Sequence, residues 1–392
     1  MHYSNNHDAW GTPPWEIDFH PVRRSLPAKV DIAIVGAGFT GLAAAAWLRL
    51  IAPEKTVAVL EAQHIGAGAS GRTGGMALSE TAAGPEKGVS DVLGSLEKFL
   101  KKLRIDCELN LNGAWEIARH PASKSKRSSP RSPIEWNDSG TLRVVSEVPG
   151  GTLHPGKLVS GLARAAHRQG AILCENHRVE GVEWNDEPKL HLALGAGRFR
   201  DITTAKIIFA TNALSLEASG LSDKTHPRLT LAILAKPVAE KVLKAIGLAD
   251  RKPFYTADLP YLWGRVRRDR SIVWGAGLVQ SPDADLEHVD IAAADTAQVF
   301  NRLEERLRNL HPLLAETKFT HRWGGPILFS DTWKPIFDWH PQSVKHGKNS
   351  KSAIVVGAYA GHGVALSSYL GKWAAEAALG RRKLPAWGAI GS

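Results

Sequence analysis

The chain has 392 residues, 43% of them hydrophobic, so it can bury a substantial core, and a disordered or fibrous protein is excluded. Lys and Arg number 49 against 39 for Asp and Glu, a net charge of +10 that could attract phosphate, an anionic membrane surface or an acidic substrate. Because Cys107 and Cys174 are the only cysteines, we expect no disulfide framework, no metal site and a reducing, cytoplasmic location.

The first predicted segment is an irregular arm. Residues 1–28 are rich in Pro, Trp, His and Asn and lack the period of a helix or a strand, so we expect them to lie over the body of the protein. They contain no basic segment followed by an apolar run, and no signal peptide is visible. The longest apolar stretch, residues 41–51, is too short to span a bilayer and predicts a buried helix instead.

A βαβ unit is predicted next. Residues 30–35 and 56–60 are apolar runs typical of buried parallel strands, and residues 43–50 favour a helix. Glycines between the first strand and the helix let the backbone approach a pyrophosphate, and an acidic residue 20 positions after the last of them would bind ribose hydroxyls. The alternative is a purely structural turn. The candidate dinucleotide contacts are Gly36, Gly38, Phe39, Thr40, Gly41 and Glu61.

A second glycine-rich segment, residues 66–76, follows directly. An NAD domain does not need such a loop after its acidic residue, whereas the longer FAD molecule needs more backbone surface for its ribityl chain and flavin. The segment therefore favours FAD. Its candidate contacts are Ala69, Ser70, Arg72, Thr73, Gly74, Gly75 and Met76.

The remaining predicted elements divide into two kinds. Pro155 opens an amphipathic helix that ends at Gly170, and residues 171–174, 178–183 and 206–210 are predicted strands. The last strand, residues 353–356, leads into a helix over about residues 364–379 that Gly380 closes. Residues 91–149 and 219–344 have a different character. Their alternating patterns, such as that of residues 271–274, are typical of a mixed or antiparallel sheet.

These elements predict an α/β fold, in which a discontinuous, Rossmann-like FAD-binding domain of the glutathione-reductase-like type carries a β-rich α+β substrate domain. No internal repeat is evident. We assign residues 1–28 to the arm, 29–90, 150–218 and 345–380 to the FAD-binding domain, 91–149 and 219–344 to the substrate domain, and 381–392 to a C-terminal tail.

Four motifs, spread over nearly the whole chain, resemble those of the FAD-dependent D-amino-acid oxidase superfamily, in the group of glycine, sarcosine and gamma-glutamylputrescine oxidases. Residues 68–75, GASGRTGG, are similar to its GASGRNGG motif, with Thr73 in place of Asn. Residues 210–213 resemble a turn beside the pyrophosphate, and residues 323–336 resemble a WGG stretch followed by Asp, Pro and Ile. Residues 361–363 before a helix resemble a GHG motif.

The resemblance implies a set of further cofactor contacts. A helix that begins near Gly363 would direct its positive end at the flavin N1/O2 edge, where negative charge gathers on reduction. His362 could stabilise that charge as oxyanion donors do, or it could serve only in packing or capping. Val179 resembles a valine whose backbone contacts adenine. The implied contacts are Val179, Ala210, Thr211, Gly325, Gly361, His362, Gly363 and Val364.

The resemblance also implies an activity. The family oxidises the C–N bond of amines or amino acids by hydride transfer to flavin N5, giving an imine. Oxygen, yielding hydrogen peroxide, or another acceptor then reoxidises the flavin. No cysteine lies in residues 323–330, where sarcosine oxidases carry the residue joined to flavin, so we expect noncovalent FAD.

Two departures from the family concern the substrate carboxylate. Ala365 stands where sarcosine oxidases carry a lysine that binds it, and Ile327 lies near the position of a glycine oxidase arginine with the same task. Arg265 could supply another anionic anchor, unless it is only a charge near a hairpin turn. Tyr261, together with Trp263 and Trp323, could line an aromatic pocket for an amine cation or an alkyl chain. The candidate catalytic residues are His362, Arg265 and Tyr261.

Two other functions stay open. The basic excess lies mostly in residues 122–133, 345–351 and 381–383, which we interpret as solvated loops and a tail, but a basic surface could bind RNA, as in tRNA-modifying enzymes with a related oxidase domain. These stretches lack the interleaved aromatic side chains of a single-strand platform, so we do not expect nucleic acid as a partner. A flavin-binding protein without turnover is the other alternative.

Overall fold

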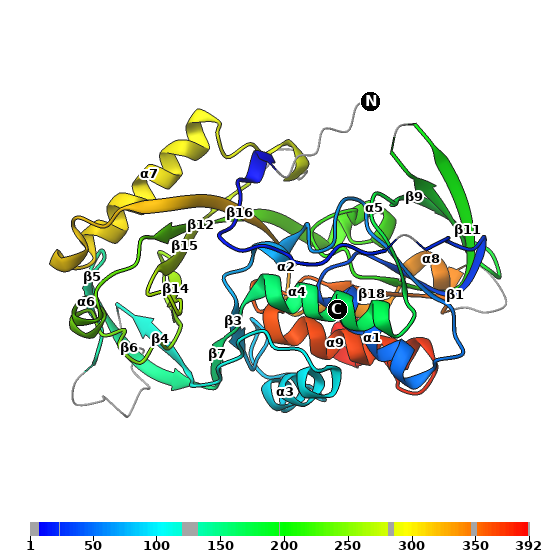
Figure 1. The fold of residues 1–392 in the computed structure, drawn as a ribbon, viewed down its shortest axis with the longest axis horizontal. Coiled ribbons are helices and arrows are strands. Elements are labelled where there is room, and N and C mark those ends of the chain that lie inside the picture. The colour runs from blue at the N-terminus through cyan, green and yellow to red at the C-terminus, as the bar shows by residue number, and fades with distance from the viewer. Residues whose placement is uncertain are drawn as a thin grey trace.

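The computed structural model describes residues 8–22, 24–119, 132–195, 197–280, 286–345 and 351–390. The basic stretches predicted at 122–133 and 345–351 lie largely outside these residues. Figure 1 shows two layers side by side: a sheet covered by helices on the right, and a second sheet on the left. Strands β12 (Thr225–Ala235) and β16 (Phe319–Ser330) belong to the second sheet and extend toward the first.

The first sheet has a parallel core. Five of its strands run parallel, and the edge strand β17 is antiparallel to β18. An antiparallel ribbon, β9 (Arg178–Glu183) and β10 (Lys189–Ala193), pairs with the first half of β11. In spatial order the strands are β17 (Ile336–Trp339), β18 (Ala353–Gly357), β11 (Phe199–Phe209), β1 (Lys29–Val35), β2 (Val57–Leu60) and β8 (Ile172–Cys174).

Small residues let the helices pack closely on this sheet. Helix α1 (Phe39–Ile51) is buried along most of its length, and it contacts α4 (Pro155–Arg168) and α9 (Gly363–Ala378). A side chain at Gly371 in α9 would meet the carbonyl oxygen of Thr40 at 2.5 Å, so only glycine allows this approach. The predicted βαβ unit is confirmed as β1, α1 and β2.

The second sheet is mixed. Its strands are antiparallel except that β13 runs parallel to β4. Helix α7 (Ala294–Asn309) packs against β12 and β15. In spatial order the strands are β16, β12, β15 (Ile272–Val279), β14 (Trp263–Val266), β13 (Phe254–Thr256), β4 (Ala114–Ala118), β6 (Thr141–Val148) and β5 (Glu135–Asn137). Together the two sheets confirm the predicted fold class.

Short elements complete the fold. A two-stranded ribbon pairs β3 (Met76–Leu78) with β7 (Gly150–Thr152). The remaining α-helices are α2 (Ala69–Arg72), α3 (Val92–Leu103), α5 (Leu216–Ser219), α6 (Glu240–Ala245) and α8 (Pro341–Lys345). The 3-10 turns are η1 (Asp8–Trp10), η2 (Ser222–Lys224), η3 (Leu286–His288), η4 (Pro312–Leu314) and η5 (Ala386–Gly388).

Two elements inside the ranges assigned to the substrate domain lie in the first layer. Helix α3 contacts α9, and it buries Leu96, Phe99 and Leu103 in the core of that layer. Strand β17 is the edge of the first sheet. Both elements have an apolar side that the helices and strands of the first layer cover, so these ranges contribute to both layers.

The N-terminal arm bridges the two layers. Trp15 donates from its indole nitrogen to the Gly71 carbonyl at 2.6 Å, which lies in the first layer. The same indole packs edge-on against Trp323 of β16, with ring centroids 5.6 Å apart. Trp10 donates to the Leu286 carbonyl at 3.1 Å. The described part of the arm is therefore attached to both sides.

Neither cysteine is a reactive thiol. Burial raises the pKa of Cys107 to about 12 and that of Cys174 to about 11, so both stay protonated at neutral pH. Among the described residues, no group of three or more His, Cys, Asp and Glu side chains could hold a metal ion. A search of the same residues finds no helix that is long and apolar enough to cross a membrane.

His340 should make the protein sensitive to acid. Its buried ring stacks on Trp184 with centroids 4.5 Å apart, and burial lowers the pKa of the imidazole to about 4. The unfolded chain, with a histidine pKa of about 6.5, therefore binds the proton more tightly, and stability is lost as the pH falls from about 6.5 to about 4. We expect a loss of roughly 3 kcal/mol in the free energy of unfolding over this window.

Urea unfolding at a series of pH values measures this effect. His340→Gln should remove that part of the pH dependence, because glutamine does not titrate. An unchanged pH dependence in the variant would contradict the assignment to His340.

Candidate functional site

A long cavity lies between the two layers, at the carboxyl ends of the parallel strands. Residues that follow β1, β2 and β11 line one side, together with α2 and the starts of α1 and α9. Strands β12, β14 and β16 of the second sheet line the other side. Ligands of open α/β sheets bind outside the carboxyl ends of the strands, and this cavity has that position.

The turn between β1 and α1 forms one end of the cavity. Gly36 has φ of +102°, and a side chain there would meet the Ala210 carbonyl at 2.8 Å, so this position requires glycine. Gly38 precedes α1 and has no side chain to cap it, and the Phe39 amide donates to Ser70 Oγ at 2.8 Å. The start of the helix thus faces the cavity with its positive end, a geometry that suits a phosphate.

Glu61 lies in the wall beside this turn. Its Oε2 accepts from the Ala37 amide at 2.8 Å and its Oε1 from the Gln63 amide at 3.0 Å. Burial raises the pKa of the Glu61 carboxyl, and these two amides oppose the shift. The carboxylate is therefore held in one orientation, and it lines the cavity where ribose hydroxyls could donate to it.

Thr211 provides an independent sign of a bound ligand. Its Oγ1 is buried and has no hydrogen-bond partner among the described residues, and the residue lines the cavity beside Ala210. A buried hydroxyl without a partner is costly, so the site fits a ligand with polar groups here. Val179 lines the same end. These residues fit the adenosine and pyrophosphate part of a dinucleotide.

The predicted glycine-rich loop contains a short helix, α2, in place of a continuous loop. A side chain at Gly74 would meet the Trp263 ring at 2.2 Å, so glycine lets the two layers touch at this point. Arg72 lines the cavity, but its guanidinium lies within 3.2 Å of the carbonyl oxygens of Trp10, Gly11 and Gly324. Arg72 therefore joins the arm, α2 and β16.

Helix α9 begins at the far end of the cavity. His362 precedes it, and no described side chain caps its first amides. Burial lowers the pKa of His362, although the Ala360 carbonyl and the charge of Glu80 act in the other direction. Tyr359 Oη lies 2.7 Å from Thr40 Oγ1, which ties this turn to α1. The first amides of α9 and His362 therefore line the same end of the cavity, where they would stabilise negative charge.

Aromatic side chains from the second sheet form the opposite wall. Trp323 is buried, and its indole nitrogen donates to the Arg72 carbonyl at 2.9 Å. The Trp263 ring lies between Gly74 and Gly275, since a side chain at either glycine would meet the ring within 2.2 Å. Tyr261 lines the same wall. The predicted aromatic pocket of Tyr261, Trp263 and Trp323 is thus brought together.

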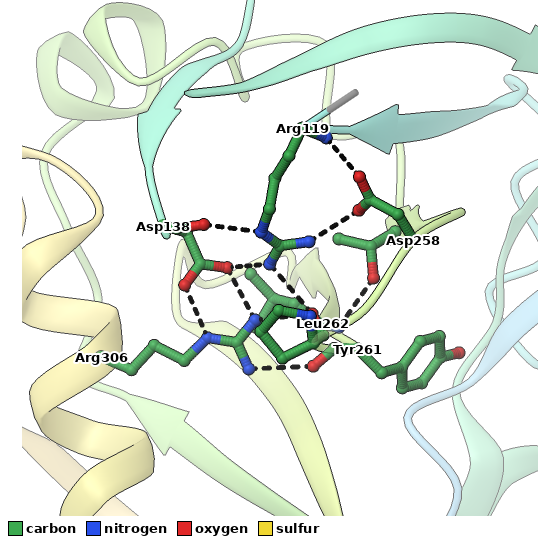
Figure 2. Close-up of polar contacts among 8 residues, drawn as sticks. Arg119, Asp138, Asp258, Tyr261, Leu262 and Arg306 are labelled. Atoms are coloured by element: carbon green, nitrogen blue, oxygen red, sulfur yellow. Dashed lines mark hydrogen bonds and ion pairs between the residues drawn. The ribbon is translucent and has the colours of Figure 1, made fainter. Parts of the chain in front are cut away.

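Buried charges hold the turn that carries Tyr261. Figure 2 shows Arg119 and Arg306 on either side of Asp138, with both guanidinium groups also directed at this turn. Arg306 donates to the carbonyls of Tyr261 and Pro260, each at 2.9 Å, and Arg119 donates to Pro260 at 2.9 Å. Arg119 also binds Asp258 through its backbone amide at 2.7 Å and through its guanidinium at 2.6 Å. We call this set the Arg119 network.

Most of the site residues predicted from the sequence line the cavity. Of the predicted site residues, only Gly41, Gly75 and Arg265 are not among those that line it. Gly41 supports the first turn, because a side chain there would meet the Gly36 carbonyl at 2.0 Å. Gly75 has φ of +78° and lies against the Leu153 carbonyl.

Arg265 lies elsewhere on the second sheet. It is in β14, two residues beyond Trp263, and is only 7% exposed. Its Nε has no hydrogen-bond partner among the described residues, and burial lowers its pKa to about 10. The lining of the cavity therefore gives no support to Arg265 as a substrate anchor, which stays a prediction.

Several lining residues were not named from the sequence. Tyr359 lies inside the predicted turn of residues 357–363, so its position was a usable signal. Leu259, Leu278 and Trp333 also line the cavity and are exposed. A single exposed apolar residue is ordinary in any protein, so the sequence carried no signal for these three.

Comparison with known proteins agrees with this geometry. The chain matches the model of a family described as FAD dependent oxidoreductase over residues 31–377. Gamma-glutamylputrescine oxidoreductase of Escherichia coli (strain K12) is 25% identical over 389 residues, covering 88% of this chain and 83% of that protein. Sarcosine oxidase subunit beta of Rhizobium meliloti (strain 1021) is 24% identical over 336 residues, covering 79% of this chain and 77% of that protein.

A solved structure shares the fold. L-proline dehydrogenase from P. horikoshii superposes with a TM-score of 0.69 at 17% sequence identity, covering 93% of this chain and 98% of that chain. The family model covers most of the chain, including the turn at Gly36, Glu61 and the start of α9. The protein therefore belongs to the DAO family of FAD-dependent oxidoreductases, and FAD is its cofactor.

Proposed function

We propose that this enzyme oxidises the C–N bond of a primary or secondary amine or an amino acid. The observation that carries the proposal is the cavity, which joins a dinucleotide turn at Gly36 to the uncapped start of α9 opposite an aromatic wall. Two relatives, gamma-glutamylputrescine oxidoreductase and sarcosine oxidase subunit beta, are named for compounds of this kind. Bound FAD would accept hydride at N5 from the carbon next to nitrogen and pass the electrons to oxygen, giving hydrogen peroxide, or to another acceptor.

The chain's own residues would hold the cofactor and orient the substrate. Gly36, Phe39 and Glu61 would bind the pyrophosphate and ribose, and the amides of Gly363 and Val364 would stabilise negative charge on the flavin. Neither cysteine is among the described residues that line the cavity, which supports noncovalent FAD. The imine product leaves the site and is hydrolysed by water, so no residue has to act as a nucleophile.

The visible spectrum of the purified protein, recorded without oxygen while amines and amino acids are added, tests this function. Flavin bands near about 380 and about 450 nm should be present, and the longer-wavelength band should bleach with a substrate. If no compound in a broad panel bleaches the bound flavin, the protein is a flavoprotein without this turnover. Readmission of oxygen, with assay of hydrogen peroxide, then separates an oxidase from a dehydrogenase that uses another acceptor.

His362 is expected to speed flavin reduction. Its Nδ1 lies 3.3 Å from the Ala360 carbonyl, which accepts one N–H, so the protonated imidazole has a second N–H at Nε2 to donate where negative charge develops. His362→Ala should lower the limiting rate of anaerobic reduction on the order of 10²-fold, while the flavin content stays the same. His191→Ala, at an exposed position of strand β10, is the matched control. An unchanged rate of flavin reduction in His362→Ala would mean that His362 serves only in packing or capping.

A further inference from the structure

Four large apolar side chains remain exposed around the cavity. Leu259 is 82% exposed, Trp333 54%, Leu278 53% and Tyr261 39%, and all four line the cavity. They are half of the eight large apolar side chains that are exposed in the described part of the chain. We call these four residues the apolar rim. Exposed apolar residues that gather at one place mark a binding surface, whereas scattered ones do not.

The backbone on one side of the rim is built to present these residues. Trp333 has φ of +62°, a left-handed conformation that bulky side chains rarely adopt. Its amide donates to the Ser330 carbonyl at 3.1 Å, and its ring packs edge-on against Phe329, which also lines the cavity. Leu278 follows a bulge at Gly277, where the pairing of β15 with β12 shifts by one residue. A bulge re-aims the side chains beside it.

The other side of the rim is held by the Arg119 network. Asp258 precedes Leu259, the Pro260 carbonyl accepts from both arginines of the network, and the Tyr261 carbonyl accepts from Arg306 (Figure 2). These bonds fix the backbone of the turn, so Leu259 and Tyr261 are anchored at the edge of the cavity. The rim is preorganised, which favours binding of a ligand of fixed shape.

The charges around the cavity favour a cation over a carboxylate. Arg72 is the one arginine or lysine among the described lining residues, and its guanidinium is engaged by three backbone carbonyls. On the acidic side, the charge of Glu80 acts on both His362 and Tyr255, and Glu116 lies beside Tyr255 in the next strand. An ammonium group at this end is favoured by the charge of Glu80, whereas among the described lining residues a carboxylate would find no arginine or lysine other than the engaged Arg72.

We infer that the apolar rim binds the body of the substrate, and that the substrate class is an amine with a long alkyl or aryl-alkyl chain and no carboxylate next to the nitrogen. This inference rests on the proposed function. The nitrogen lies at the end of the cavity near His362, and the chain extends toward Leu259, Leu278 and Trp333.

A chain-length series tests the substrate class. The holoenzyme is mixed without oxygen with n-alkylamines from ethylamine to octylamine, and flavin bleaching gives a dissociation constant and a limiting rate for each. The dissociation constant should fall about three- to fourfold for each methylene that the rim covers. Phenethylamine should bind at least about tenfold more tightly than phenylalanine, whose carboxylate would be left without a partner.

Variants of the rim link this selectivity to named residues. Leu278→Ser and Trp333→Asn should each weaken octylamine binding by about tenfold, with ethylamine binding and the limiting rates unchanged. Asparagine tolerates the left-handed backbone at position 333. Leu313→Ser is the matched control, because Leu313 is 52% exposed but does not line the cavity. Leu313→Ser should change neither the dissociation constant nor the limiting rate for octylamine or ethylamine.

A binding readout keeps the inference separate from turnover. α,α-Dimethylphenethylamine has no hydrogen on the carbon that bears nitrogen, so it can bind but cannot be oxidised. Its calorimetric dissociation constant should rise in Trp333→Asn and not in Leu313→Ser. Equal binding of ethylamine and octylamine, tighter binding of phenylalanine than of phenethylamine, or rim variants without effect would overturn the inference. If no amine or amino acid bleaches the flavin, the proposed function fails, while calorimetry still reports on the rim.

Discussion

Glu61→Ala is expected to yield a folded protein that is purified without flavin. The carboxylate of Glu61 is positioned by the amides of Ala37 and Gln63 and faces the cavity. Two charge-assisted hydrogen bonds to ribose hydroxyls, each worth about 1.5–3 kcal/mol, would be lost, which corresponds to roughly two to four orders of magnitude in affinity. The fold should survive, because removal of the buried carboxylate also removes the cost of its desolvation.

The ratio of absorbance at about 450 nm to that of the protein measures the flavin content, and far-UV circular dichroism reports the fold. Glu180→Ala, on the exposed side of β9, is the matched control and should keep its flavin. Glu61→Gln retains an acceptor for one amide, so its affinity for FAD should lie between those of Glu61→Ala and Glu180→Ala. Full flavin content in Glu61→Ala would show that the acidic residue after β2 does not hold the ribose.

Asp138→Ala should cost about 3–5 kcal/mol of stability. The Asp138 side chain is 4% exposed, and it accepts from Arg306 Nε at 2.9 Å, from Arg306 Nη2 at 2.7 Å and from Arg119. Without it, Arg306 loses its carboxylate partner beside the buried Arg119 guanidinium, and Arg119 keeps only its ion pair with Asp258. Breaking a buried ion pair on one side is far more costly than the net value of the intact pair.

Urea unfolding of Asp138→Ala measures this cost as a shift of the midpoint at constant slope. Asp138→Asn, which keeps the shape and one acceptor, should lose less. Asp223→Ala, at an exposed position in η2, is the control and should change the free energy of unfolding by no more than about 0.5 kcal/mol. A loss below about 1 kcal/mol in Asp138→Ala would mean that water reaches the Arg119 network freely.

The parts of the site that could be predicted from the sequence are those whose residues lie close together along the chain at fixed positions. The turn at Gly36, the acid at Glu61 and the helix start at Gly363 each combine a buried strand with glycines at fixed positions, and the structure places all of them in one cavity. Strand β11 was predicted as residues 206–210 but covers Phe199–Phe209, because its first half pairs with β10 at the surface and lacks a continuous apolar run.

Other parts had no local signal. The Arg119 network joins the residue that follows β4, the turn after β5, the turn before β14 and helix α7. Charges so far apart in sequence look like ordinary surface residues until the second sheet and α7 bring them together. The packing of α3 on α9 is similar, because an amphipathic helix shows that one face is covered but not by which element.

The arm also bears on how the enzyme moves. Trp10, Trp15 and the carbonyls of Trp10 and Gly11 make hydrogen bonds to both layers, so the arm ties the two layers together. Hinge opening of one layer against the other would break all of these hydrogen bonds. Rigid-body motion of the layers is therefore a costly way to exchange substrate or cofactor. We expect small molecules to exchange through the gap that the apolar rim surrounds, whereas a hinge opening that releases FAD would first have to break the hydrogen bonds of the arm. On this basis we expect the arm to slow the loss of FAD without slowing turnover.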